Sequence, residues 1–160
     1  MSFKHTFEYN IFEEQIEITK DFLQKIKQYP LTKDTMNSHN FLKKDKSLFN
    51  LVNKKIELFL KKHSLKLIDS WIQKYNENNY HSVHTHFATV KDYSFVWFID
   101  GDRDSSPIIF YEVGYPIINT GKKIIFDFKP GTFLLFPGFM PHEVPLNKSN
   151  NRLIISGNAI

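Results

Sequence analysis

The pattern of apolar and polar positions changes once along the chain, near residue 65. Before this point, apolar residues recur at the three- and four-residue spacing of amphipathic helices. Residues 19–29 and 47–63 each carry an apolar stripe with lysines off it, and Pro30 ends the first segment. Both segments are predicted to be helices that pack against a sheet. Residues 7–18 alternate enough to predict an opening strand.

After residue 65 the helical period disappears and short β-branched and aromatic runs follow one another. Turn residues such as Asn119, Gly121 and Gly131 separate these runs. Seven or eight short strands in the remaining residues are typical of a β-sandwich or a jelly-roll barrel. The pattern therefore predicts a mainly β fold with N-terminal helices. The predicted strands cover residues 65–75, 81–87, 93–100, 107–112, 122–128, 132–136 and 152–160.

Length and composition limit the kinds of protein that this chain can be. A chain of 160 residues suits one domain, with residues 1–64 as a supporting strand and helices and residues 65–160 as the β core. No apolar run is long enough to span a bilayer and residues 1–10 do not resemble a secretory signal, so we expect a cytoplasmic protein without membrane contact. Cysteine is absent. Any metal must therefore be bound by His, Asp or Glu.

The net charge of +4 comes from lysines that are interleaved with acidic residues in the first half of the chain. This pattern is typical of solvated helix faces rather than of a nucleic-acid footprint. Only Arg103 and Arg152 are arginines among the 21 basic residues. An arginine in such a lysine-biased chain is expected where its planar, forked geometry matters.

Three histidines lie in the short segment Tyr80–His86. On a strand, side chains at i and i+2 project from the same face, so His84 and His86 are predicted to point together. His81 has the opposite parity and is left out of the predicted ligand set. A facial metal site needs a third protein ligand, and the turn at Pro137 is expected to bring His142 alongside the pair.

Ten residues after His142, the final predicted strand begins with Arg152. Alternation places Arg152, Ser156 and Asn158 on one face of this strand. If that face points inward, an arginine on it requires an anionic partner. A bound carboxylate that accepts two parallel hydrogen bonds would supply one.

These residues resemble the iron(II)- and 2-oxoglutarate-dependent oxygenases, in particular a phage and bacterial group with His-x-His in place of His-x-Asp. The resemblance covers residues 65–160, and the motifs occur in the family's order: His84 and His86, then His142, then Arg152. It implies a double-stranded β-helix, or jelly roll, buttressed by helices. Trp71 also falls where the family has an aromatic strand.

The resemblance further implies the role of each site residue. His84, His86 and His142 would bind Fe(II). Arg152 would bind the distal carboxylate of 2-oxoglutarate, supported by Ser156 and Tyr75. The reaction with O2 would release succinate and CO2 and hydroxylate a substrate.

Two positions depart from the family pattern. His86 stands where relatives more often have a carboxylate, and Phe98 stands where many carry a tyrosine hydroxyl for the cosubstrate. Tyr93 or Tyr75 could supply that contact instead.

Two other functions stay open from the residues alone. Cupin-type metal proteins or dioxygenases also use three histidines, and Gly131, Pro137 and His142 partly fit their pattern. Leu146 stands where a cupin has asparagine, however, and a cupin gives no role to Arg152. A non-enzymatic β-sandwich, such as an interaction or virion component, is the third alternative. The sequence does not specify the oligomeric state or whether the substrate is a protein, a nucleic acid or a small molecule.

Overall fold

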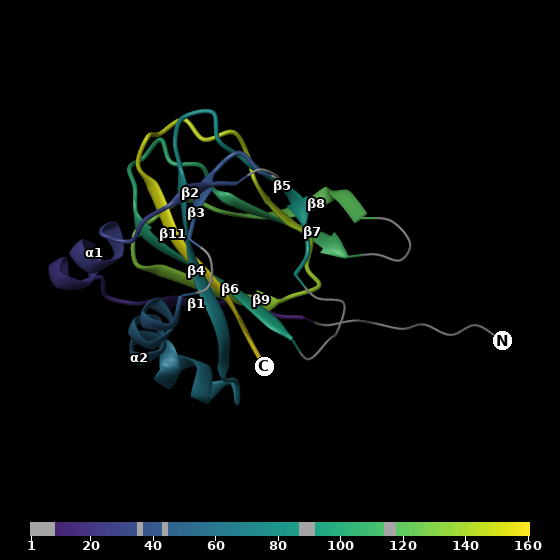
Figure 1. Cartoon of the computed structure of the whole chain (residues 1–160). Helices are drawn as coiled ribbons and strands as arrows, with labels where there is room; N and C mark the ends of the chain where they lie inside the picture. Colours follow the sequence, from purple (N-terminus) through teal and green to yellow (C-terminus); the bar gives the residue numbers. More distant parts are fainter. Residues whose placement is uncertain (1–8, 35–36, 43–44, 87–91, 114–117) are drawn as a thin grey trace.

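The computed structural model describes residues 9–34, 37–42, 45–86, 92–113 and 118–160. Two antiparallel sheets face each other, and two helices pack on the outer side of the larger sheet (Figure 1). The larger sheet has the strand order β1-β9-β6-β11-β4-β3-β2, and the smaller has the order β5-β10-β7-β8. The elements are β1 (Phe12–Gln15), α1 (Lys20–Lys27), β2 (Thr32–Lys33), β3 (Asn40–Phe41), α2 (Lys46–Lys62), β4 (Leu67–Tyr75), β5 (His81–His84), β6 (Tyr93–Asp100), β7 (Ile108–Val113), β8 (Ile118–Phe126), β9 (Thr132–Pro137), β10 (His142–Val144) and β11 (Arg152–Ala159).

Both helices begin at a side-chain cap and bury one apolar face. The Thr19 hydroxyl accepts from the backbone N–H of Phe22, and the Asp45 carboxylate accepts from that of Leu48. The stripe of α2 that includes Leu48, Val52 and Ile56 is buried against the sheet, as its helical spacing predicts. No helix of the described residues is both long and apolar enough to cross a membrane.

The central strands of the larger sheet are buried on both faces, and their alternate residues feed two separate cores. On β6, Phe95, Trp97 and Ile99 enter the core beneath the helices, whereas Val96 and Phe98 enter the core between the sheets. Strand β9 divides its residues in the same way. The period of two along each strand therefore builds both layers of the fold.

The predicted mainly β jelly roll with supporting helices is confirmed. The two predicted helices and all seven predicted strands after residue 65 are present; β6 has the predicted bounds and the other elements have shifted ends. The prediction of turn residues at Asn119 and Gly121 was wrong, because β8 begins at Ile118 and continues through them. Residue 87, the predicted end of the second strand, lies outside the described part of the chain. The opening strand is shorter than predicted, at Phe12–Gln15, and residues 7 and 8 lie outside the described part of the chain. Strands β2, β3 and β10 have two or three residues each, too few to show a hydrophobic period, and they were not predicted.

Candidate metal centre

The side chains of His84, His86 and His142 converge at the end of the smaller sheet. One nitrogen of each imidazole lies within 4.8 Å of the others, and no other described residues form a comparable group of three ligands. The His142 ring centroid lies 4.3 Å from that of His84 and 5.2 Å from that of His86. The structure thus brings together the three histidines that the sequence predicted as metal ligands.

Backbone contacts orient two of these rings. Nδ1 of His84 lies 2.8 Å from the carbonyl oxygen of Ser82, and Nδ1 of His142 lies 2.9 Å from that of Met140. A carbonyl only accepts, so each Nδ1 carries the proton and each Nε2 keeps a free lone pair. Hydrogen bonding through one ring nitrogen is the usual way in which a protein fixes a metal-ligating histidine.

The pairing of β10 with β5 explains how His142 reaches the other two histidines. The turn after Pro137 closes with a hydrogen bond from Met140 N–H to the Pro137 carbonyl, at 3.0 Å. Strand β10 then runs antiparallel to β5, with His142 directly opposite His84. The return of the chain at Pro137, predicted from sequence, is confirmed.

The local geometry around His81 and His86 differs from the strand alternation used to predict it. Strand β5 ends at His84, so His86 lies beyond it and is held by a hydrogen bond from its N–H to the Gly138 carbonyl, at 2.8 Å. A register shift between His142 and Val144 disturbs the pairing with β5. His81 consequently stacks on His84, with ring centroids 3.9 Å apart, instead of pointing away.

Burial keeps the clustered histidines neutral. Desolvation lowers the pKa of His142 well below its usual range and lowers the pKa of His86 to about 4. It also lowers the pKa of His84. Neutral imidazoles are the form that binds a metal cation, so the site is electrostatically prepared for one at neutral pH.

A buried polar network stands behind His86. The Asn158 side chain hydrogen-bonds with the His86 ring, and the charge of Asp69 favours the protonated imidazole. Asn158 Nδ2 donates to the Asp69 carboxylate at 2.8 Å, and Ser94 Oγ donates to Asn158 Oδ1 at 3.0 Å. Asn158 thus links the His86 ring to the Asp69 carboxylate, which is not one of the three converging ligands.

Arg152 is fully buried on the inner face of β11, as its parity with Ser156 predicted. Its Nε donates to the carbonyl oxygen of Ser106 at 2.8 Å, while its two terminal nitrogens have no hydrogen-bond partner among the described residues. The guanidinium carbon lies 4.5 Å from the Tyr75 ring centroid, and desolvation lowers the pKa of Arg152 to about 10. Two buried donors without acceptors are costly, which indicates a site for an anion.

The residues predicted to support Arg152 in binding the cosubstrate lie in different surroundings. Tyr75 lies beside the guanidinium, and its hydroxyl is 3.4 Å from Nδ1 of His81. Phe98 packs on the same guanidinium from 5.9 Å. Tyr93 packs on the helix side of the sheet near Phe12 and therefore faces away from this site. Ser156 is buried and donates to Gln73 Oε1 at 3.1 Å.

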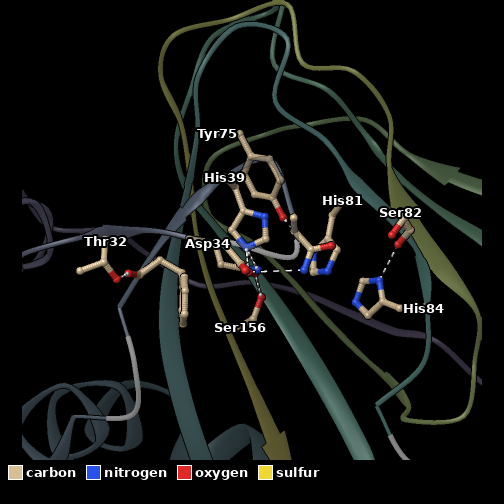
Figure 2. Close-up of polar contacts among 11 residues, drawn as sticks. Thr32, Asp34, His39, Tyr75, His81, Ser82, His84 and Ser156 are labelled. Carbon is tan, nitrogen blue, oxygen red and sulfur yellow. Dashed lines mark hydrogen bonds and ion pairs between the residues drawn. The ribbon is translucent and has the colours of Figure 1, made fainter.

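Two adjoining cavities meet the histidines. The inner one, about 30 Å³, lies between the sheets and is lined by the three converging histidines, Tyr75, Ser156 and neighbouring apolar residues. The outer one, about 500 Å³, shares His84 and His86 with it and extends over β3 and β4. Figure 2 shows Tyr75, His39 and His81 lying close to one another; His39 and His81 line the outer cavity, and Tyr75 and His81 line the inner one.

Sequence reasoning missed several residues around the site. His39 and Asp34 come from the β2–β3 region, where no element was predicted, and no local pattern identifies them. Trp71 and Gln73 line the outer cavity from β4. Asn158 could have been found, because it shares the strand face of Arg152 and Ser156. Asn147, one residue after the position at Leu146 where a cupin has asparagine, donates through Nδ2 to the carbonyls of residues 75, 76 and 149.

No protein-family model matches the sequence, and no curated protein matches it significantly. Solved structures do match the fold. HygX from Streptomyces hygroscopicus, solved with nickel, 2-oxoglutarate and hygromycin B, has 8% identity and a TM-score of 0.73, over 94% of this chain and 82% of HygX. A Pseudomonas putida prolyl-4-hydroxylase has 15% identity and a TM-score of 0.59, over 93% of this chain and 91% of that enzyme.

The viral collagen prolyl hydroxylase of Paramecium Bursaria Chlorella virus-1, solved with 2-oxoglutarate, has 13% identity and a TM-score of 0.62. It is matched over 93% of this chain and 94% of its own length. A Burkholderia pseudomallei member of the 2OG-Fe(II) oxygenase family is also similar, with a TM-score of 0.63. Identities this low establish architecture only. The chain therefore has the jelly-roll fold of the 2-oxoglutarate- and iron(II)-dependent oxygenases.

Proposed function

We propose that the protein is an iron(II)- and 2-oxoglutarate-dependent oxygenase of the His-x-His group, which hydroxylates a substrate with release of succinate and CO2. The observation that carries the proposal is Arg152, a fully buried arginine whose two terminal nitrogens lack partners among the described residues. It packs on the ring of Tyr75, which lines the inner cavity together with the three converging histidines. A metal site alone would not require it.

The residues fit both groups chemically. His84, His86 and His142 would hold Fe(II) through neutral imidazoles, and Arg152 would bind the distal carboxylate of 2-oxoglutarate by two parallel hydrogen bonds. Three imidazoles bring no negative charge to a metal dication, and a dianionic cosubstrate supplies the missing charge. When bound, iron, 2-oxoglutarate and O2 together provide oxidative decarboxylation and the transfer of one oxygen atom to the substrate.

The chain's own residues position and shield these groups. Ser82 and Met140 fix the orientation of two imidazoles through their carbonyls. Phe110 and Phe136 pack against His142 with centroid distances of 5.6 and 4.9 Å and keep water from its buried side. Tyr75 and Ser156 lie on the wall of the inner cavity and would contact the cosubstrate. That cavity is narrow, so we expect Tyr75 and His81 to separate when 2-oxoglutarate enters.

Anaerobic titration tests the proposal. Addition of Fe(II) and then 2-oxoglutarate should produce a weak metal-to-ligand absorption band in the visible range, and admission of air should release succinate. Arg152→Met should abolish the band and 2-oxoglutarate binding while it leaves Fe(II) binding intact. His86→Asp should retain metal binding if His86 occupies the ligand position.

The alternatives give different results in the same experiment. A cupin-type protein would bind the metal but not respond to 2-oxoglutarate. A non-enzymatic β-sandwich would bind neither. Equal loss of Fe(II) binding and 2-oxoglutarate binding in Arg152→Met would make Arg152 a structural residue and would contradict the proposal.

A further inference from the structure

Trp71 stands at the junction of the inner and outer cavities. It has the same parity on β4 as Tyr75, which belongs to the inter-sheet core, so its side chain projects into the space between the sheets. The indole lines both the inner cavity of about 30 Å³ and the outer cavity of about 500 Å³. His84 and His86 line both cavities as well. A molecule in the outer cavity would therefore lie beside Trp71 and two of the proposed metal ligands.

The indole of Trp71 is nearly parallel to two of the converging imidazoles. The Trp71 and His86 rings are inclined by 20° with centroids 5.9 Å apart, and the His86 and His142 rings are inclined by 14° with centroids 5.2 Å apart. His142 is buried, whereas Trp71 is partly exposed. This row of three rings therefore leads from the buried part of the metal centre to a tryptophan that a ligand can reach.

Rings make up most of the described wall of the outer cavity. Six of the nine described residues that line it carry an aromatic or imidazole ring: His39, Phe41, Trp71, His81, His84 and His86. Phe41, like Trp71, is partly exposed. His39 is buried, and its ring packs on those of Tyr75 and His81 at centroid distances of 5.0 and 4.8 Å. These contacts orient the His39 ring in the absence of a ligand.

An aromatic ring is the group that gains most from such a wall. Any apolar group of suitable size would cover the exposed surface of Trp71 and Phe41 and remove it from water. An aromatic ring gains in addition from the offset-stacked and edge-to-face arrangements that pairs of rings adopt. Burial keeps imidazoles such as that of His39 neutral, so they offer ring faces rather than positive charges. An aliphatic group of equal size lacks the second contribution.

We propose that the outer cavity binds the substrate through an aromatic ring that stacks on the indole of Trp71, with Phe41 as a second aromatic contact. This inference rests on the proposed function, because the cavity is a substrate site only if the histidines beside it hold iron. An aromatic small molecule and an aromatic side chain of a protein offer the same chemistry, and the experiment separates them.

The indole N–H signals of the Zn(II)-loaded, nitrogen-15-labelled protein test the inference, with and without 2-oxoglutarate. Zn(II) is diamagnetic and accepts imidazole ligands. The chain has two tryptophans, and Trp97 is fully buried in the core beneath the helices, so its signal is an internal control. Trp71→Phe assigns the other signal by its loss. The unlabelled probes are Nα-acetyl-tyrosine amide, Nα-acetyl-cyclohexylalanine amide, Nα-acetyl-lysine amide, 4-methylphenol and a decapeptide that contains one tyrosine.

We expect the aromatic probes to shift the Trp71 signal through their ring currents and to leave the Trp97 signal unchanged. The tyrosine amide should bind about 3- to 10-fold more tightly than the cyclohexylalanine amide, equivalent to about 0.7–1.4 kcal/mol. Tighter binding of the decapeptide than of the tyrosine amide would identify a protein substrate. Tighter binding of 4-methylphenol than of both would identify an aromatic small molecule.

Variants assign the preference to the ring of Trp71, and the proton signals of the probes report the affinities. Trp71→Leu keeps apolar volume but removes the ring, so it should bind the tyrosine and cyclohexylalanine amides equally. Trp71→Phe keeps a ring and should keep the preference. Phe49→Leu is the matched control, because Phe49 is a partly exposed phenylalanine on α2 and lies outside this cavity. The indole shift of the unaltered protein decides the question without a substitution if Trp71→Leu does not fold.

The outcomes separate this inference from the proposed function. If 2-oxoglutarate binds but the tyrosine and cyclohexylalanine amides bind equally, the lysine amide binds more tightly than both, or no probe binds, the aromatic-ring proposal is overturned and the proposed function stands. If the aromatic probes shift the Trp71 signal while 2-oxoglutarate does not bind, the proposed function fails and the aromatic binding site stands. Equal weakening of both amides by Trp71→Leu would make Trp71 a structural residue and would overturn the inference.

Discussion

Arg152→Met removes the buried guanidinium but keeps an unbranched apolar side chain in the same space. If Arg152 serves a cosubstrate, it destabilises the ligand-free protein, since its two terminal nitrogens are buried without partners among the described residues. The variant should therefore be about as stable as the wild type in the absence of ligands, although it loses 2-oxoglutarate binding. A structural arginine would give the opposite result.

The magnitude follows from the contacts of the guanidinium. Two unsatisfied buried donors cost about 1–3 kcal/mol each. Against this, the variant loses the hydrogen bond to the Ser106 carbonyl, about 1–3 kcal/mol, and the cation–π contact with Tyr75, about 1–2 kcal/mol. These gains and losses are of similar size, and the guanidinium also contacts the Phe98 and Phe128 rings, so the free energy of unfolding should change by no more than about 1 kcal/mol, or about 2–4 °C in melting temperature for a chain of this size.

Urea unfolding and thermal melting in EDTA measure this change, and the same melts with Ni(II) and 2-oxoglutarate measure the ligand response. The wild type should gain stability when 2-oxoglutarate is added to the nickel-loaded protein, whereas Arg152→Met should not. Arg103→Met is the matched control, because Arg103 is 93% exposed and its replacement should change stability by less than about 0.5 kcal/mol. A loss of more than about 2 kcal/mol in Arg152→Met, with the 2-oxoglutarate response retained, would refute the reasoning.

Three further predictions concern the buried histidines and strand β11. Asn158→Ala breaks the link between His86 and Asp69 and should weaken Ni(II) binding about 10- to 100-fold in calorimetry, whereas Ser94→Ala, which leaves that link in place, should change it far less. Acidification in EDTA should destabilise the fold between about pH 6.5 and pH 4, because burial lowers the folded-state pKa values of His39 and His86 to about 4 and the unfolded chain therefore binds protons first. Urea midpoints that stay constant over this range would contradict the neutral, buried state of these rings. Gly157→Ala should lower the free energy of unfolding by about 1–3 kcal/mol, because an added Cβ would clash with the Asp69 carbonyl and the Phe95 ring. An unchanged urea midpoint would show that the strands can separate there without cost.

Local sequence patterns were sufficient to predict the helices and the longer strands of the fold. The apolar stripe of α2 and the alternation of β6 and β9 depend on residues close together in sequence, so their period can be read directly. The same alternation placed Arg152 and Ser156 on one strand face, and the structure shows that both are buried. The i, i+2 spacing of His84 and His86 and the turn before His142 predicted that these three histidines would group, and the structure brings their side chains together.

Tertiary structure decided the details that depend on distant segments. His86 points toward His84 as predicted, but its N–H is held by the Gly138 carbonyl rather than by strand pairing. His81 stacks on His84 beside a register shift, so the strand parity that placed His81 on the opposite face was wrong. Strands β2 and β3 are too short to have a period, yet β3 pairs with β4 and β2 pairs with β3, and this brings Asp34 and His39 to the cavity wall. Sequence determined which residues could carry the chemistry, because residue type and period are local. Which of them share a cavity, and with what charge, depended on long-range pairing and burial, which no local pattern records.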